Sequence, residues 1–550
     1  MKIRNYNIYF NTHTISGIIV SALLYVIFFA GTLSFFKKEF SAWQANESTY
    51  QKEIDHRNFQ VPLDSLSATK DLTGRNIIYY LSQGGVHGYI NVSASQDTLR
   101  NKKNKAALKP VGQEKRKGRG RGGDSDASYF GYNFIQNKAS DYASSYDLGE
   151  FFYRLHFLAP LNEVPIRLPF APFGYFIAGL TSFIFLFALI TGLLLHWDKL
   201  VSNFYIFRPY SKWKTIWTDM HTALGVIGFP YQLVYAITGI VLILNSVLMV
   251  PFDKMLYKDA EVSLYEDLGE IHNFPLSYSY SKLDTAFNLG HYIQLTRDKW
   301  PGSKLKRIYI NNYGDKEMYI TIETEPPFKQ SFAGSGLLSM RIIDGTILKE
   351  KSPTDDVNYI DRIKSVFYRL HFGDFAGYPL KIVYFILGIM GCFVIISGIL
   401  IWLVARDKNN VIRRKRVFNF WLANVFLAIC LTMLPVSAIT FVWIKFSAEV
   451  NQSLIYKVYF NLWWILALYY IIRRNINRTS RETLFLGAIS SFLVPIANGI
   501  QSNNWMWHTF IQRKLDIFYV DFLWLLIGLI SLIAFVKMKN FVKSDKSSAG

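Results

Sequence analysis

The chain has 550 residues and a formal net charge of +20, and its composition is 51% hydrophobic and 17% aromatic. This apolar content exceeds that of an average soluble protein and predicts a membrane protein. The sequence contains only two cysteines, Cys392 and Cys430, and both lie inside apolar runs, which excludes a disulfide framework.

Eight apolar runs are long enough to cross a hydrocarbon core of about 30 Å. They cover residues 13–36, 172–196, 217–250, 379–404, 418–445, 457–472, 483–501 and 517–537. We interpret the first run as an anchored helix because it is longer than a signal-peptide core and lacks a small-residue cleavage site. Lysine and arginine gather at both ends of the chain and after the second, fourth and sixth runs, which predicts cytoplasmic termini. Topology therefore explains part of the net charge, and we expect no nucleic-acid partner.

The segments between these runs predict two inserts and a C-terminal module. In chain order we expect a first span in 1–36, a first insert in 37–150, an interfacial segment and second span in 151–196, a cytoplasmic loop in 197–216, a third span in 217–252, a second insert in 253–366, a fourth span in 367–405, a basic loop in 406–417 and a four-span module in 418–550. The loop 101–128 is basic and lacks apolar residues, which predicts disorder.

Each insert has the pattern of a small α+β module outside the cytoplasm. The first predicts a helix near 62–71 and strands at 76–81 and 88–94, and the second predicts a helix at 281–298 and strands at 305–310, 317–323 and 338–344. The predicted fold class is therefore an all-α polytopic membrane protein with about eight transmembrane helices and two small α+β extracytoplasmic inserts.

Two sequence motifs each occur twice before residue 405. His13-Thr14-x-x-Gly17 and a later Gly31 match His221-Thr222-x-x-Gly225 and a later Gly239, with 18 residues from the histidine to the last glycine in both copies. FFYRLHF ends at Phe157 and VFYRLHF ends at Phe372, and each precedes an apolar run that closes on a small residue and a glycine, Thr191-Gly192 or Ser397-Gly398. The first four spans therefore form a duplicated, histidine-bearing unit, and symmetric histidines are expected to meet near its axis.

The predicted topology separates five histidines by depth. His13, His196 and His221 belong to the cytoplasmic edge, whereas His156 and His371 belong to the outer edge. Facing histidines at two depths in a helical bundle suit two bis-histidine haems, while the lack of a C-x-x-C-H motif excludes the usual covalent attachment.

The repeat pairs four of these histidines as axial ligands of the haem irons. It joins His13 with His221 and His156 with His371, and it aligns His196 with Trp402. His196 stays an alternative ligand on the cytoplasmic side, or a contact to a haem propionate or a quinone.

The repeat also contains glycines and arginines that are not candidate iron ligands. Gly17 and Gly225 lie one turn beyond their histidines and would let a flat ring approach, and Arg154 and Arg369 are candidate partners of haem propionates. We interpret the small-residue and glycine pairs as mostly helix packing, without a catalytic role. The remaining histidines are expected to be ordinary surface residues; they are His56, His87, His272, His291 and His508.

With these motifs the chain resembles the PepSY-associated transmembrane proteins, a family that includes inner-membrane ferric-siderophore reductases. The resemblance rests on the H-x3-G and R-L-H-F phrases and on the run ITGLLLHWDKL to DMHTALGVIGFPYQL, and it covers about residues 1–405. It implies PepSY-type inserts, the bacterial inner membrane, two b-type haems and electron transfer to a periplasmic ferric chelate. It says nothing about the last four spans.

The expected function is thus a membrane-bound di-haem oxidoreductase that reduces a ferric siderophore or another ferric chelate for iron release. Its other partners would be membrane lipid and a cytoplasmic or membrane electron donor, either a flavoprotein or a quinol. Two alternatives stay open. In one, the protein is a non-redox binding or transport module whose inserts bind a peptide, a peptidase or a chelate. In the other, the histidines bind zinc or copper directly, although carboxylates and thiolates are scarce near them.

Overall fold

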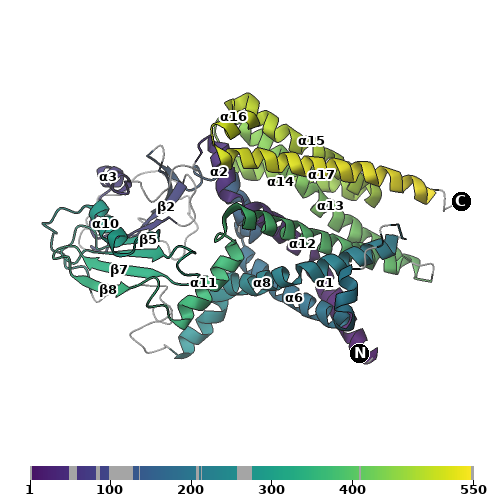
Figure 1. The fold of residues 1–550 in the computed structure, drawn as a ribbon, viewed down its shortest axis with the longest axis horizontal. Helices are drawn as coiled ribbons and strands as arrows, with labels where there is room; N and C mark the ends of the chain where they lie inside the picture. The colour runs from purple at the N-terminus through teal and green to yellow at the C-terminus, as the bar shows by residue number, and fades with distance from the viewer. Residues whose placement is uncertain are drawn as a thin grey trace. The chain divides into compact units, whose positions relative to one another are not determined.

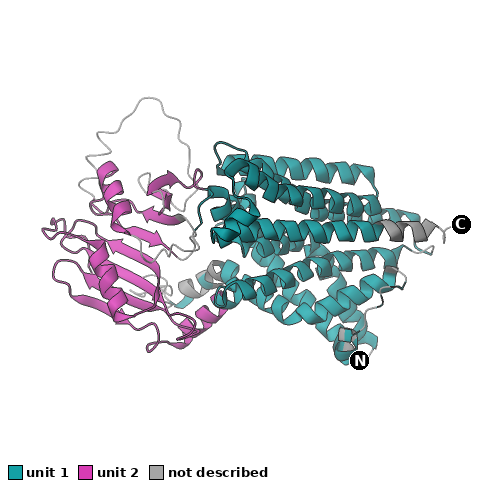
Figure 2. Cartoon of the chain, turned by 45° about the horizontal axis from the view of Figure 1, so that its top comes forward, with its two compact units in different colours: residues 1–48, 146–260, 369–550 teal, residues 49–145, 261–368 magenta. Residues whose placement is uncertain are grey.

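The structure is a computed structural model in which the chain forms two compact units (Figure 2). It describes residues 3–48, 58–81, 87–97, 128–134, 137–205, 208, 210–211, 213–256, 276–407 and 410–546. The membrane unit comprises residues 1–48, 146–260 and 369–550, and the sheet unit comprises residues 49–145 and 261–368. The basic loop predicted to be disordered lies outside the described residues, apart from Ser128.

Eight of the helices in the described part of the chain are long and apolar enough to cross a membrane, and each coincides with a predicted span. They are α1 (Ile3–Ser34), α6 (Phe173–His196), α8 (Trp213–Leu256), α12 (Gly377–Arg406), α13 (Arg413–Lys445), α14 (Gln452–Arg473), α15 (Ile476–Ser502) and α17 (Leu515–Lys546). The prediction of eight transmembrane helices is confirmed. Shorter helices connect them; they are α2 (Lys37–Ala45), α5 (Leu148–His156), α7 (Leu200–Tyr205), α11 (Tyr359–Phe372), α16 (Met506–Ile511) and two 3-10 turns at Ala159–Glu163 and Trp197–Lys199.

The first four long helices form a bundle (Figure 1). Helix α1 packs against α6 and α12, and α8 packs against the same two helices, so α1 and α8 face each other across the centre. Glycines allow the close approach of α12 to α1, because a Cβ on Gly391 would lie 2.5 Å from the Phe28 ring. This arrangement brings the two H-x3-G helices to opposite sides of one bundle core.

The C-terminal helices α13, α14, α15 and α17 pack on one another and hold α2 through a buried polar cluster. Trp43 of α2 donates its indole N–H to Asp521 at 2.7 Å, and Asn498 donates to the other carboxylate oxygen at 2.7 Å. Lys445 donates to the carbonyl of Trp43 at 2.7 Å. Because Asp521 and Trp43 are fully buried, each polar group needs these partners, and the cluster fixes α2 against the last four spans.

Helix α5, which carries the first R-L-H-F phrase, begins with a buried ion-pair cluster. Its N-cap Asp147 accepts from the backbone N–H of Glu150, and the Glu150 carboxylate pairs with Lys37 and Arg154 at 2.6 Å each. Burial by itself would raise the pKa of Glu150, but the two cations outweigh it and lower the pKa to about 2. The carboxylate therefore stays ionised at any ordinary pH.

This cluster predicts a pH-dependent contribution to stability. A depressed carboxyl pKa stabilises the fold fully above its usual value of 4.5, and the contribution is lost as the pH falls toward about 2. Glu150→Gln leaves Lys37 and Arg154 without their counter-ion and is expected to lower the free energy of unfolding at neutral pH by about 3 kcal/mol. Thermal unfolding in detergent at several pH values measures this difference, which should shrink between pH 4.5 and 2. A difference that is independent of pH would contradict the ion-pair assignment.

An aromatic contact joins α5 to the C-terminal module. Phe151 is fully buried, and its ring lies 4.7 Å from that of Tyr459 in α14, which is fully buried too. Phe151→Ala is expected to lower the free energy of unfolding by about 3–5 kcal/mol, because it leaves a cavity between the two elements. Thermal unfolding in detergent measures the loss, and Tyr129→Ala, at an exposed ring of the sheet unit, is the control. Equal effects of the two substitutions would contradict this packing.

The sheet unit contains one antiparallel sheet to which both inserts contribute. Its strand order is β4-β3-β2-β1-β5-β6-β7-β8. The strands are β1 (Ile77–Tyr80), β2 (His87–Val92), β3 (Ser128–Asn133), β4 (Lys138–Asp141), β5 (Lys304–Asn311), β6 (Tyr319–Glu325), β7 (Gly336–Arg341) and β8 (Ile347–Lys351). The α+β composition of the inserts is confirmed, but the inserts are not two separate sheets. The first strand of each, β1 and β5, pairs antiparallel with Ile78 opposite Tyr309, which removes two sheet edges that would otherwise be exposed.

One helix from each insert completes the core of this sheet. Helices α3 (Gln60–Thr69) and α10 (Leu289–Lys299) bury Leu63 and Ile293 in the same cluster as the strand residues Ile77 and Ile308. The shared hydrophobic core explains why the two inserts fold together although residues 146–260 of the membrane unit separate them in sequence.

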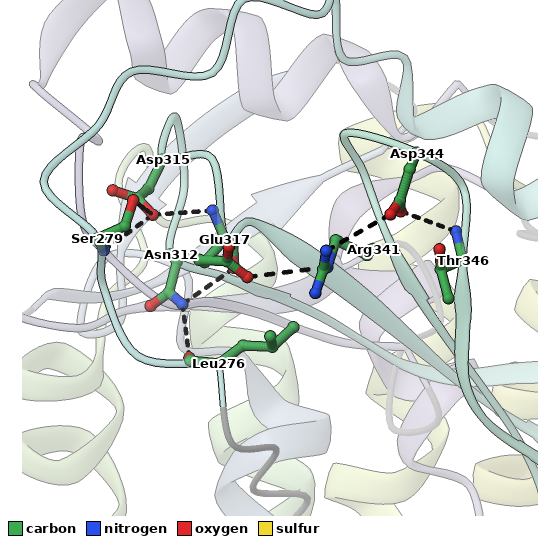
Figure 3. A network of polar contacts seen from close by, with 8 residues as sticks. All are labelled: Leu276, Ser279, Asn312, Asp315, Glu317, Arg341, Asp344 and Thr346. Atoms are coloured by element: carbon green, nitrogen blue, oxygen red, sulfur yellow. Dashed lines mark hydrogen bonds and ion pairs between the residues drawn. The ribbon is translucent and has the colours of Figure 1, made fainter.

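The helix predicted at 281–298 begins only at Leu289. Figure 3 shows the cause: the buried Asp315 accepts from the backbone N–H and hydroxyl of Ser279, and the backbone N–H of Glu317 also donates to it. Asp315 also accepts from the backbone N–H of Ser281. These bonds satisfy backbone donors outside a helix and hold the segment against the turn after β5.

Candidate functional site

Two histidines meet at one end of the four-helix bundle. The ring centroids of His13 in α1 and His221 in α8 lie 6.0 Å apart, with 67° between the ring planes. His13 Nδ1 bonds to the carbonyl of Ala188 in α6 at 2.8 Å, and His221 Nδ1 bonds to the carbonyl of Val394 in α12 at 2.9 Å. We call these two residues the His13 pair.

Two other histidines meet toward the other end of α1. The ring centroids of His156 in α5 and His371 in α11 lie 5.9 Å apart, with 45° between the planes. His156 Nδ1 bonds to the carbonyl of Ile27 at 2.9 Å, and His371 Nδ1 bonds to the hydroxyl of Thr238 at 2.8 Å. We call these two residues the His156 pair. The pairing expected from the repeat is therefore the pairing that the fold brings together.

The hydrogen bonds assign the same tautomer to all four rings. A carbonyl oxygen only accepts, so Nδ1 of His13, His156 and His221 carries the hydrogen. The Thr238 hydroxyl donates its one hydrogen to the carbonyl of Val234 at 2.7 Å and therefore accepts from His371. With Nδ1 protonated, Nε2 of each neutral ring carries the lone pair that can bind a metal, which is the second-shell arrangement typical of ligating histidines.

Three glycines set how closely these rings approach the helices. A Cβ on Gly192 would lie 3.0 Å from the His13 ring, a Cβ on Gly398 would lie 3.1 Å from the His221 ring, and a Cβ on Gly31 would lie 2.5 Å from His156 Nδ1. The interpretation of the small-residue and glycine pairs as mostly helix packing leaves out one feature, because the glycines at 192 and 398 each lie directly against a histidine. The signal in the sequence is their equal position in the two copies.

Two further glycines, Gly17 and Gly225, have open space beside them and no neighbouring side chain. A Cβ on Gly17 or on Gly225 would meet nothing within 4 Å. Each follows its histidine by four residues and so lies on the same helix face, one turn farther into the bundle. All four paired histidines also keep part of their surface accessible, although they lie inside the bundle. The faces of α1 and α8 therefore leave room beside the His13 pair.

The two pairs are well separated along the bundle axis. His156 bonds at Ile27, 14 residues after His13, and His371 bonds at Thr238, 17 residues after His221. At a rise of about 1.5 Å per residue these intervals correspond to about 21 and 26 Å, most of the thickness of a hydrocarbon core.

The remaining candidates lie around these pairs. His196 ends α6, on the side of the His13 pair, and interacts electrostatically with His221. Arg154 pairs with Glu150 and donates to the hydroxyl of Tyr175 at 3.1 Å, so part of its guanidinium is already engaged. Arg369 precedes His371 by two residues in α11. Whether either arginine meets a propionate stays a prediction.

The other histidines that the structure describes lie in separate elements. His291 is exposed in α10, His508 bonds to the carbonyl of Asn503 in α16, and His87 lies in β2. His56 and His272 lie outside the described residues. Within the described ranges no three His, Cys, Asp or Glu side chains gather as a metal site.

The loop that the charge pattern predicts to be cytoplasmic is hydrogen-bonded to α8 through Arg208. Arg208 donates twice to Asp219, at 2.9 and 2.8 Å, and its backbone N–H donates to the same carboxylate. Asp219 precedes His221 by two residues and is buried. This bidentate pair fixes the loop at the start of α8, and it partly neutralises the positive charge of Arg208.

The helices and the histidine pairs define a class: a polytopic membrane protein whose bundle core carries two facing histidine pairs, with an α+β sheet unit inserted between its spans. The chain belongs to the family of the PepSY-associated TM region, which matches residues 10–405. The match covers both histidine pairs and both inserts and ends before the last four spans. No curated protein matches the chain.

Proposed function

We propose that this protein is a haem-containing oxidoreductase of the bacterial inner membrane that passes electrons outward to a periplasmic ferric chelate, such as a ferric siderophore. The observation that carries the proposal is that four histidines form two facing pairs. The Nδ1–H of each of the four rings is hydrogen-bonded to the protein. The first four spans act as a duplicated unit that builds one haem site at each end.

The donor set fits a bis-histidine haem on three points. Two metal–imidazole bonds of about 2 Å, plus about 1 Å from each nitrogen to its ring centre, give about 6 Å, and the observed centroid separations are 6.0 and 5.9 Å. The fixed tautomer leaves Nε2 as the ligand atom. At the His13 pair, open space beside Gly17 and Gly225 provides room for a flat macrocycle.

When bound, a haem b supplies reversible one-electron chemistry between iron(III) and iron(II). The residues of the chain bind, orient and insulate. His13 with His221 would hold one haem, and His156 with His371 would hold the other, while α6 and α12 close the bundle between them. Four histidines fill two axial sets, so His196 is proposed as a neighbouring contact to a propionate or a quinone.

The substrate is proposed to be a chelate of iron(III) with hard oxygen ligands, docked on the periplasmic side. Adding one electron gives iron(II), which such ligands hold more weakly, and the metal leaves the chelate. No proton transfer by a side chain is required. The donor is a cytoplasmic flavoprotein or a membrane quinol, and both termini would lie in the cytoplasm, as the lysine and arginine distribution favours.

The visible spectrum of the detergent-purified protein tests this proposal. We expect b-type bands that sharpen after dithionite, and a pyridine haemochrome assay should give about two haems per chain. Anaerobic addition of a ferric chelate to the reduced protein should then oxidise both haems. A colourless protein from haem-replete cells would overturn the proposal and favour a non-redox binding or transport module.

A further inference from the structure

One face of α8 carries a polar side chain between the two histidine pairs. His221, Gly225, Gly228, Gln232 and Tyr235 follow one another at helical spacing and point to the same side of the helix. This is the side that faces α1 across the bundle core. Gln232 is the amide-bearing residue of this set, 11 residues beyond His221.

The amide of Gln232 is buried and lacks a partner. The residue is 2% exposed, and its Nε2 has no hydrogen-bond partner among the described residues. Nε2 lies 2.9 Å from where a Cβ on Gly228 would be, so the side chain folds back along the helix toward its N-terminus. This direction leads to Gly225, which borders the open space beside the His13 pair.

The matching positions of α1 are apolar. Val20 and Leu24 lie 7 and 11 residues beyond His13, as Gly228 and Gln232 do beyond His221, and they are 3% and 5% exposed. Of the two equivalent positions, Leu24 in α1 and Gln232 in α8, only the one in α8 therefore carries an amide donor. A buried donor without an acceptor destabilises the fold, so its presence in one copy calls for an acceptor that the described residues do not provide.

We propose that the Gln232 carboxamide, which lies between the two histidine pairs, donates a hydrogen bond to a propionate of one bound haem and raises the reduction potential of that haem. This inference rests on the proposed function. An N–H dipole aimed at a redox group in a low-dielectric bundle stabilises the form that has gained an electron. The two haems would then differ in potential because of this residue, although their histidine ligands are equivalent.

Potentiometric titration of the purified protein, followed in the visible spectrum, tests the inference. In Gln232→Leu one of the two b-type components should shift to lower potential while the other stays in place. At the wild-type midpoint, its ratio of reduced to oxidised haem should fall about tenfold, as expected for one buried hydrogen bond to a charged group. Two bound haems with both midpoints unchanged would overturn the inference. If one haem is lost instead, its return when Leu24→Gln is added would support the inference, and its continued absence would count against the inference.

Two further measurements separate this role from a structural one. Adding Leu24→Gln to Gln232→Leu restores the donor from the opposite helix and should move the shifted midpoint back; a midpoint that does not move back would count against the role. In protein prepared without haem, Gln232→Leu should raise the Tm because it removes an unpartnered donor, and a lowered Tm would show that the amide is satisfied within the bundle. If wild-type protein binds no haem, the proposed function fails; if it binds two and Gln232→Leu changes nothing, only this inference fails.

Discussion

Replacing His371 with alanine is expected to lower the haem content from about two to about one per chain and to abolish chelate reduction. The substitution removes one ring of the His156 pair and leaves His156 without the partner 5.9 Å away. The His13 pair, about 21 Å distant along α1, keeps all its contacts. The pyridine haemochrome assay measures the content, and the remaining spectrum should be that of one low-spin component.

His508→Ala is the matched control for this experiment. It removes a histidine of α16 whose hydrogen bond among the described residues goes to the nearby carbonyl of Asn503, so both haems and chelate reduction should persist. Two full haem signals in purified His371→Ala protein would contradict the assignment of the His156 pair. Loss of both haems with unfolding would be recognised by a lowered Tm, and His371→Met, which keeps a possible ligand, would then replace the alanine variant.

Gly225→Leu is expected to remove the haem of the His13 pair without unfolding the protein. A Cβ at this position meets nothing within 4 Å, so a larger side chain fits the haem-free bundle but occupies the space that a macrocycle needs. The haem content should fall to about one per chain, with the component of the His156 pair unchanged. Haem content and the Tm of haem-free protein are the two measurements.

A glycine with a different environment provides the contrast. A Cβ on Gly179 in α6 would lie 2.4 Å from the Leu244 side chain, so Gly179→Leu should lower the Tm of haem-free and haem-loaded protein alike. If Gly225→Leu protein bound two haems, the space beside Gly225 would not be the haem site. The two variants therefore separate a blocked cofactor site from a disturbed helix contact.

The sequence alone determined the spans and the identity of the histidine pairs. Long apolar runs with few charges indicate membrane helices, and all eight predicted runs coincide with helices that are long and apolar enough to cross a membrane. The repeat paired His13 with His221 and His156 with His371 because a duplicated unit places equivalent residues about a common axis, and these rings do lie about 6 Å apart.

Only the tertiary structure decided what surrounds those histidines. The carbonyls of Ala188, Val394 and Ile27 that bond Nδ1 belong to helices far away in sequence, and backbone acceptors have no sequence signature. The same holds for the pairing of β1 with β5, since strand partners across a long interruption depend on a shared core and not on local pattern. The unpartnered amide of Gln232 is likewise visible only once the helix faces are known. Periodicity in a sequence fixes which residues share a face, but the neighbour of that face is set by packing in three dimensions.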